Sequence, residues 1–168
     1  GVHNLPLVCI VQNNIYAISV PVDRQMAVEN VADRAPMFGV AGATYDGNDV
    51  LASYRVTREA VERARDPDAS PRATLLEAKT YRPVPHSSDD DDRTYRSREE
   101  VEQWKRRDPI LRFRAYLLEK GILTSERVEE YEAHAKREID EAQAYAEAAP
   151  YPPPESALGP VFAPLPGE

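Results

Sequence analysis

Two asparagines that follow an apolar segment are the first residues of this chain that could do chemistry. Residues 5–11, Leu-Pro-Leu-Val-Cys-Ile-Val, are apolar throughout, and Gln12, Asn13 and Asn14 come next. Ligands of open α/β sheets lie at the carboxyl ends of the strands. An asparagine oxygen and a nearby backbone carbonyl are hard donors suited to Mg²⁺ that also binds phosphates and water. The other interpretation is a simple turn, and spacing alone favours the turn.

His86 is the second candidate, because it lies in a long loop with unusual neighbours. Prolines that stiffen the backbone precede it, and two serines and the four aspartates 89–92 follow it. A carboxylate next to the ring would favour the protonated imidazole, which could serve as a proton donor. The alternatives are a surface histidine and a solvated acidic run. His3 and His134 have no comparable setting.

Other chemistries find little support in the sequence. No serine stands in a sharp strand–turn–helix elbow, and no cysteines and histidines have metal-ligand spacing. Asp46-Gly47 lacks the glycine-rich surroundings of a phosphate-binding loop, so capping of the next helix explains it better.

Three short apolar segments around one helix predict a parallel α/β layer. The segments are residues 5–11, 40–45 and 73–80. Asp49 is placed to cap a helix over 50–65, whose apolar residues recur every three or four positions. Strand, helix and strand of these lengths form a crossover between parallel strands. The first segment, apolar at every position, predicts a strand covered on both faces. Residues 15–20 are expected to continue extended.

Beyond the loop over 81–98, the pattern becomes helical. Three helices are predicted, over 99–107, from Pro109 to Gly121 and from Ser125 to 149. The sequence therefore predicts three parts. They are the carboxyl-terminal part of an α/β domain with its loop (1–98), a helical region (99–149) and an extended proline-rich tail (150–168).

Composition and charge exclude several classes of protein. Of 168 residues, 21 are Lys or Arg and 29 are Asp or Glu, so the formal net charge is −8, which argues against a nucleic-acid-binding protein. No apolar run approaches the roughly 20 residues that span a bilayer. The single cysteine, Cys9, favours a reducing compartment. Because the chain opens on Gly1 and enters an apolar strand almost at once, we expect it to be part of a longer protein.

An ordered series of motifs resembles the alpha subunit of the decarboxylating component of 2-oxo acid dehydrogenases. Residues 11–19, Val-Gln-Asn-Asn-Ile-Tyr-Ala-Ile-Ser, resemble the second half of the thiamine-diphosphate motif, which begins with Gly-Asp-Gly and ends in Asn-Asn. The motifs that follow in the family's order are 46–50, 77–82, 86–90, 95–97, 108–110 and 116–118. Each is weak alone, but the ordered set is specific and covers essentially the whole chain. His86-Ser-Ser-Asp-Asp90, with Glu77-Ala78 before it, is closer to the branched-chain type than to the pyruvate type.

The resemblance implies a parallel-sheet thiamine-diphosphate-binding fold, followed by a helical region, and thiamine diphosphate and Mg²⁺ as cofactors. Asn14 would give a side-chain oxygen to Mg²⁺ and Tyr16 its backbone carbonyl. His86 would be catalytic and would lie near the cofactor diphosphate, in a loop that orders when cofactor binds. Ser87 occupies the position that is phosphorylated in the animal enzymes.

The same resemblance implies an activity and partners. The enzyme would oxidatively decarboxylate branched-chain 2-oxo acids and pass the acyl group to a lipoyl group on an acyltransferase. It would be a cytoplasmic heterotetramer of two alpha and two beta chains that serves branched-chain amino acid catabolism, with no nucleic acid or membrane partner.

Two departures from the family pattern limit what this chain can do. The Gly-Asp-Gly half of the motif, with its aspartate ligand, would precede Gly1, and Gln12 stands where some relatives carry arginine. The carboxylate that activates the cofactor belongs to the beta subunit, so the chain alone is expected to be inactive. The alternatives are a pyruvate or acetoin dehydrogenase alpha subunit and a non-catalytic α/β interaction module.

Overall fold

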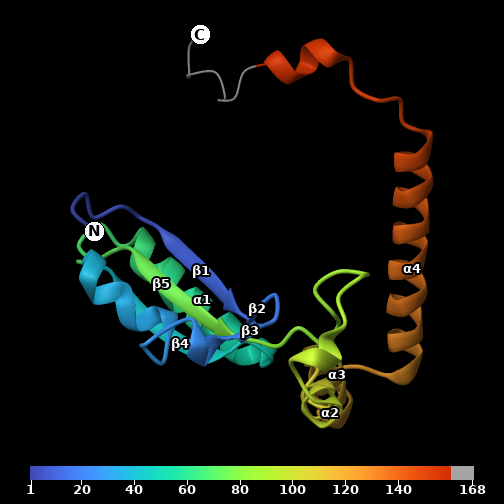
Figure 1. The fold of residues 1–168 in the computed structure, drawn as a ribbon, viewed down its shortest axis with the longest axis horizontal. Coiled ribbons are helices and arrows are strands. Elements are labelled where there is room, and N and C mark those ends of the chain that lie inside the picture. The colour runs from blue at the N-terminus through green and yellow to red at the C-terminus, as the bar shows by residue number, and fades with distance from the viewer. Residues whose placement is uncertain (160–168) are drawn as a thin grey trace. The chain divides into compact units, whose positions relative to one another are not determined.

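Parallel strands in the order β1-β5-β4 form the centre of the fold. The structure, a computed structural model, describes residues 1–159. The strands are β1 (Val8–Asn13), β4 (Ala41–Asp46) and β5 (Thr74–Lys79). Asn13 and Asp46 both pair with Lys79, so the three strands end at one edge (Figure 1). The predicted parallel α/β layer is confirmed.

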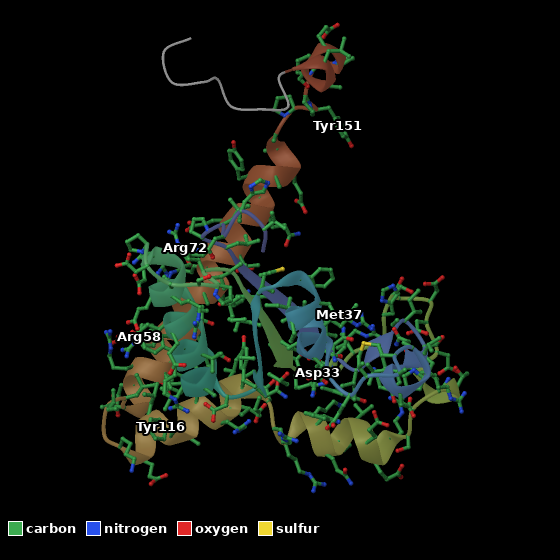
Figure 2. All side chains as sticks on the ribbon, turned by 90° about the vertical axis from the view of Figure 1, so that its left-hand side faces the viewer. Asp33, Met37, Arg58, Arg72, Tyr116 and Tyr151 are labelled. Carbon is green, nitrogen blue, oxygen red and sulfur yellow. The ribbon has the colours of Figure 1, made fainter. Side chains whose placement is uncertain are left out.

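Helices cover both faces of this sheet. The helix α1 (Val50–Arg65) begins at Asp49, whose carboxylate accepts the backbone N–H of Ala52 at 2.8 Å, as the sequence predicts. The 3-10 helix η2 (Val31–Phe38) lies on the other side of the strands. Figure 2 shows the two sides, with Arg58 on α1 and Met37 on η2.

Gly42 of β4 lets η2 approach the sheet closely. A Cβ at this position would lie 2.7 Å from the Ala32 carbonyl oxygen and 2.8 Å from the Ala35 Cβ. Both alanines are buried. The backbone of η2 therefore rests almost directly on β4.

The first strand is more exposed than its apolar sequence predicts. The side chain of Cys9 is exposed, and Ile10 retains 53% of its accessible surface. The reason is the position of β1, which is an edge strand, whereas η2 packs on β4 and β5. The prediction that both faces of this strand are covered is wrong for this chain.

Residues 15–20 form a hairpin, not the continuous extended segment that the sequence predicts. The strands β2 (Tyr16–Ala17) and β3 (Val20–Pro21) pair antiparallel, and the 3-10 helix η1 (Val22–Arg24) follows. The chain reverses at Ile18, which has a positive φ of 56°. Left-handed backbone is unusual for a β-branched residue, so residue types alone gave no sign of this turn.

Two helices complete the first unit of the chain, Gly1–Lys120. They are α2 (Arg98–Lys105) and α3 (Pro109–Glu119). Arg112 of α3 donates to the Asp46 carboxylate at 3.2 Å and ties the helix to the end of β4. Burial alone would raise the pKa of Asp46, but the hydrogen bonds from the Asn48 backbone and from Arg112 lower it.

The second unit, Gly121–Glu168, contains the long helix α4 (Ser125–Ala148) and the 3-10 helix η4 (Pro154–Leu158). The Thr124 side chain caps α4 by accepting the backbone N–H of Arg127. The unit boundary falls at residue 120, inside the region 99–149 that the sequence groups as helical. The tail over 150–168 was predicted to be extended, but η4 is a 3-10 helix within it. Residues 160–168 of this tail lie outside the described residues. Among residues 1–159, every helix lacks the combination of length and apolar character that a membrane span requires.

Candidate functional site

The turn after β1 carries the two asparagines and brings Asn14 and Tyr16 together. Asn13 Oδ1 accepts the N–H of Ile15 at 3.0 Å, and Asn14 Oδ1 accepts the N–H of Tyr16 at 3.2 Å. These are two overlapping Asx turns. Between them Ile15 adopts a positive φ of 63°. A cavity of about 200 Å³ is lined by this turn and by Gln12, among other residues.

The oxygen atoms on this turn are suitable ligands for a hard divalent cation. Asn14 and Tyr16 present an amide oxygen and a backbone carbonyl oxygen two residues apart, and Mg²⁺ prefers oxygen ligands that it shares with phosphates and water. In residues 1–159 no three His, Cys, Asp or Glu side chains gather in a way that could hold a metal ion. A cation bound here would therefore depend on these neutral oxygens and on ligands from elsewhere.

The phenol of Tyr16 anchors the turn to α2. It donates to the two Glu100 carboxylate oxygens at 3.0 and 3.2 Å, and Tyr81 donates to the same carboxylate at 3.0 Å. Burial and the hydrogen bond to Glu100 raise the pKa of each phenol to about 12. Trp104 stacks on Tyr81 with ring centroids 5.0 Å apart. The backbone that offers the Tyr16 carbonyl is therefore held by its own side chain.

A buried arginine joins this cluster to the loop that carries His86. The guanidinium of Arg96 lies 6.0, 5.3 and 5.9 Å from the ring centroids of Tyr16, Tyr81 and Tyr95. Its side chain is fully buried and pairs with Asp92 at 2.7 Å, in the 3-10 helix η3 (Asp92–Thr94). One cation thus contacts rings from three separate segments.

His86 lies in an exposed loop that is fixed by its neighbours. Asp90 accepts the backbone N–H of His86 at 2.8 Å and the phenol of Tyr95 at 2.6 Å. Arg82 donates to the Ile18 carbonyl at 2.8 Å, and its other terminal nitrogen lies 3.4 Å from the His86 Nδ1. The loop is thereby attached to the hairpin after Asn14.

The ring of His86 has a different neighbour from the one that the sequence predicts. The contact with an aspartate is made by the backbone N–H, whereas the Nδ1 faces the guanidinium of Arg82, which has only donors. The expected imidazole–carboxylate contact is not the one formed here.

Sequence reasoning missed the charged residues that hold the site together, namely Glu77, Asp92, Arg96 and Glu100. Glu77 offered a signal, because it is a charged residue that directly follows Leu75 and Leu76 in a predicted strand. The other three lie in polar surroundings of the sequence, where a surface position is the ordinary expectation.

Comparisons with known proteins agree with this architecture. A family described as the dehydrogenase E1 component matches residues 1–155. The chain is 49% identical over 163 residues to the 2-oxoisovalerate dehydrogenase subunit alpha of Bacillus subtilis, covering 97% of this chain and 48% of that protein. It is 47% identical over 136 residues to the 3-methyl-2-oxobutanoate dehydrogenase subunit alpha of Mycobacterium tuberculosis, covering 81% and 36%.

A pyruvate-type relative is less similar than these two bacterial branched-chain subunits. The pyruvate dehydrogenase E1 component subunit alpha of Bacillus subtilis is 42% identical over 151 residues, covering 89% of this chain and 40% of that protein. The chain therefore spans about half, or less, of the length of these relatives. The resemblance seen in the motifs is confirmed, including its preference for the branched-chain type. This chain belongs to the dehydrogenase E1 component family, among the alpha subunits.

Proposed function

We propose that the chain is the carboxyl-terminal part of the alpha subunit of a branched-chain 2-oxo acid dehydrogenase. The enzyme would oxidatively decarboxylate 3-methyl-2-oxobutanoate and related acids and transfer the acyl group to a lipoyl group of an acyltransferase. Two alpha and two beta chains would form the active cytoplasmic heterotetramer. The observation that carries the proposal is the match over residues 1–155, together with the higher identity to the two bacterial branched-chain subunits than to the pyruvate-type subunit.

In this proposal, Asn14 and Tyr16 bind Mg²⁺ through the Asn14 side-chain oxygen and the Tyr16 carbonyl. The adjacent turn and its cavity support the assignment. Mg²⁺ held by these residues would neutralise part of the charge of the cofactor diphosphate, and thiamine diphosphate, when bound, would supply the electron sink for decarboxylation. The protein contributes positioning and electrostatic stabilisation.

His86 is proposed to act beside the cofactor diphosphate. With its Nδ1 turned to Arg82, the Nε2 of the ring is directed away from that arginine and is left to contact a ligand. The same network orients the ring without involving it in a buried ion pair. His86→Ala is therefore expected to slow acyl transfer to lipoamide or to weaken cofactor retention. Wild-type rates in a lipoamide-coupled assay would contradict this role.

The metal role is tested by Asn14→Ala in the full-length alpha subunit assembled with its beta subunit. We expect cofactor-dependent activity to be lost while the subunit stays folded. Calorimetry with thiamine diphosphate and Mg²⁺ should show weaker binding. Asn30→Ala is a matched control, since the Asn30 amide pairs with Asp33 of η2. Unchanged cofactor affinity of Asn14→Ala would refute the assignment.

The substrate is tested by turnover. Rates with 3-methyl-2-oxobutanoate, pyruvate and acetoin separate the branched-chain enzyme from the pyruvate and acetoin types, which the 42% identity to a pyruvate-type subunit keeps as the second candidate. The absence of thiamine diphosphate binding by the assembled enzyme would instead favour a non-catalytic interaction module.

A further inference from the structure

The carboxylate of Glu77 is buried in the middle of the sheet and is surrounded by donors. It is 0% exposed. One oxygen accepts Asn13 Nδ2 at 2.6 Å and lies 2.8 Å from Lys79 Nζ, and the other accepts the backbone N–H of Ala32 at 2.9 Å. Burial alone would raise the pKa of Glu77, but these hydrogen bonds lower it. The group is therefore an anion inside the fold, on the β-strand next to the candidate metal turn.

An anionic Glu77 fixes which way the Asn13 amide points. A carboxylate can only accept hydrogen bonds, so the amide nitrogen of Asn13 must face it. The amide oxygen is then directed to the N–H of Ile15, 3.0 Å away. The backbone carbonyl of Asn13 is also held, because it accepts the N–H of Thr80 at 2.9 Å. The end of β1 is thus fixed by both its side chain and its backbone.

This orientation supports a conformation that the turn would otherwise avoid. Ile15 is β-branched and has a φ of 63°, in a region that such residues adopt only where the surroundings enforce it. The hydrogen bond from its N–H to Asn13 Oδ1 and the one from the N–H of Val22 to its carbonyl at 2.9 Å both enforce it. Ile15 separates Asn14 from Tyr16, so its conformation sets the distance between their oxygens.

We propose that Glu77 is a positioning residue for the metal-binding turn: it orients the Asn13 amide, which holds Ile15 left-handed and brings the Asn14 and Tyr16 oxygens together. The inference rests on the proposed function, because it concerns the same turn. Glu77 contacts neither proposed ligand oxygen. It acts through Asn13, as outer-shell partners do in metal sites, where their loss weakens metal affinity about 10–100-fold.

The test is Glu77→Gln in the full-length alpha subunit assembled with its beta subunit. The introduced glutamine keeps the shape but has one oxygen that accepts and an NH₂ group that only donates, so its two ends cannot accept from both Asn13 and Ala32. Mn²⁺, used as a paramagnetic probe of the Mg²⁺ site, is titrated by electron paramagnetic resonance in the presence of thiamine diphosphate. We expect at least roughly tenfold weaker Mn²⁺ binding, and kcat at saturating cofactor within about threefold of wild type.

A reversed pair separates positioning from simple loss of stability. In the double variant Asn13→Asp with Glu77→Gln, the glutamine amide can donate to the new carboxylate at position 13 while its oxygen accepts from Ala32. That carboxylate can still accept from the N–H of Ile15, so we expect this variant to recover most of the Mn²⁺ affinity. Leu76→Val is the control, because Leu76 is 1% exposed and precedes Glu77 on the opposite face of β5. It should lose stability but keep Mn²⁺ affinity.

The outcomes distinguish this inference from the function on which it rests. If the wild-type enzyme binds Mn²⁺ and Glu77→Gln binds it equally well, the proposed role of Glu77 is overturned and the proposed function is not. Weak binding by Leu76→Val, or no recovery in the reversed pair, shows that Glu77 matters only for folding and also overturns it. If Glu77→Gln fails to assemble, assembly and Mn²⁺ binding by the reversed pair support the inference, and failure of both variants overturns it. A wild-type enzyme that binds neither thiamine diphosphate nor Mn²⁺ overturns the proposed function as well.

Discussion

The buried ion pair between Arg96 and Asp92 gives the sharpest test of how the turn after β1 is joined to the loop that carries His86. Asp92 receives two hydrogen bonds from the guanidinium, at 2.7 and 3.0 Å, and its side chain is 4% exposed. Asp92→Asn keeps the size of the side chain but removes its charge, which leaves the arginine cation buried without its counter-ion.

The expected loss of stability depends on the contacts that Arg96 keeps in the variant. Removing one partner of a buried ion pair costs about 3–5 kcal/mol. Arg96 retains its hydrogen bond to the Arg82 carbonyl at 2.5 Å and its contacts with three tyrosine rings, so we expect the lower end of this range. About 3 kcal/mol corresponds to roughly a hundredfold change in the local opening equilibrium.

Hydrogen exchange of the assembled enzyme measures this opening directly. The N–H groups of Tyr95 and Arg96 both donate to the Asp92 carbonyl, so their exchange reports opening of this segment. Asp92→Asn should speed their exchange about a hundredfold. Asp91→Asn is the matched control, because Asp91 pairs with Arg93 at the surface, where ion pairs contribute about 0–1 kcal/mol. Exchange rates within threefold of wild type for Asp92→Asn, or equal effects of both variants, would refute the reasoning.

Three further predictions concern single positions. Gly47→Ala would place a Cβ 2.5 Å from the Thr80 Cγ2 and should lower stability by about 1–3 kcal/mol, seen as a lower Tm. Asp46 has a lowered native pKa, so its contribution is present above the unfolded aspartate pKa of about 3.9 and is lost as pH falls through the native value. Asp46→Asn should therefore flatten the fall in Tm between pH 6 and pH 3, and an unchanged slope would contradict this. Thr124→Ala removes the cap of α4 and should cost the helix about 1 kcal/mol, measured as faster amide exchange of Arg127. Unchanged exchange would show that the cap is not used.

The elements that sequence reasoning predicted well are those whose signals are local. The helix over 50–65 begins after Asp49 as expected, because the cap and the apolar periodicity both lie within the segment itself. The strands near 40–45 and 73–80 were likewise recognisable from short apolar runs. The turn after β1 was also recognisable, because two asparagines directly follow the apolar strand and their side chains form its hydrogen bonds, whereas the metal role stays a prediction.

The parts that sequence reasoning missed depend on contacts between distant segments. The reversal at Ile18 contradicts the local preference of isoleucine, so only the surrounding fold explains it. Arg96 and Glu100 have the sequence surroundings of surface residues, and only the fold brings tyrosines from separate segments around them. The exposure of Ile10 depends on the order of strands in the sheet, which residue types do not encode.

The close contact at Gly42 also limits which substitutions this protein can accept during evolution. A methyl group there would push away the segment whose Ala32 N–H holds the Glu77 oxygen, and through it the amide at the end of the first strand. Position 42 should consequently accept only glycine in functional homologues, although it faces Ala32 and Ala35 of η2 and is not part of the turn after β1. A small residue outside the candidate site would then be as intolerant of substitution as the proposed metal ligands.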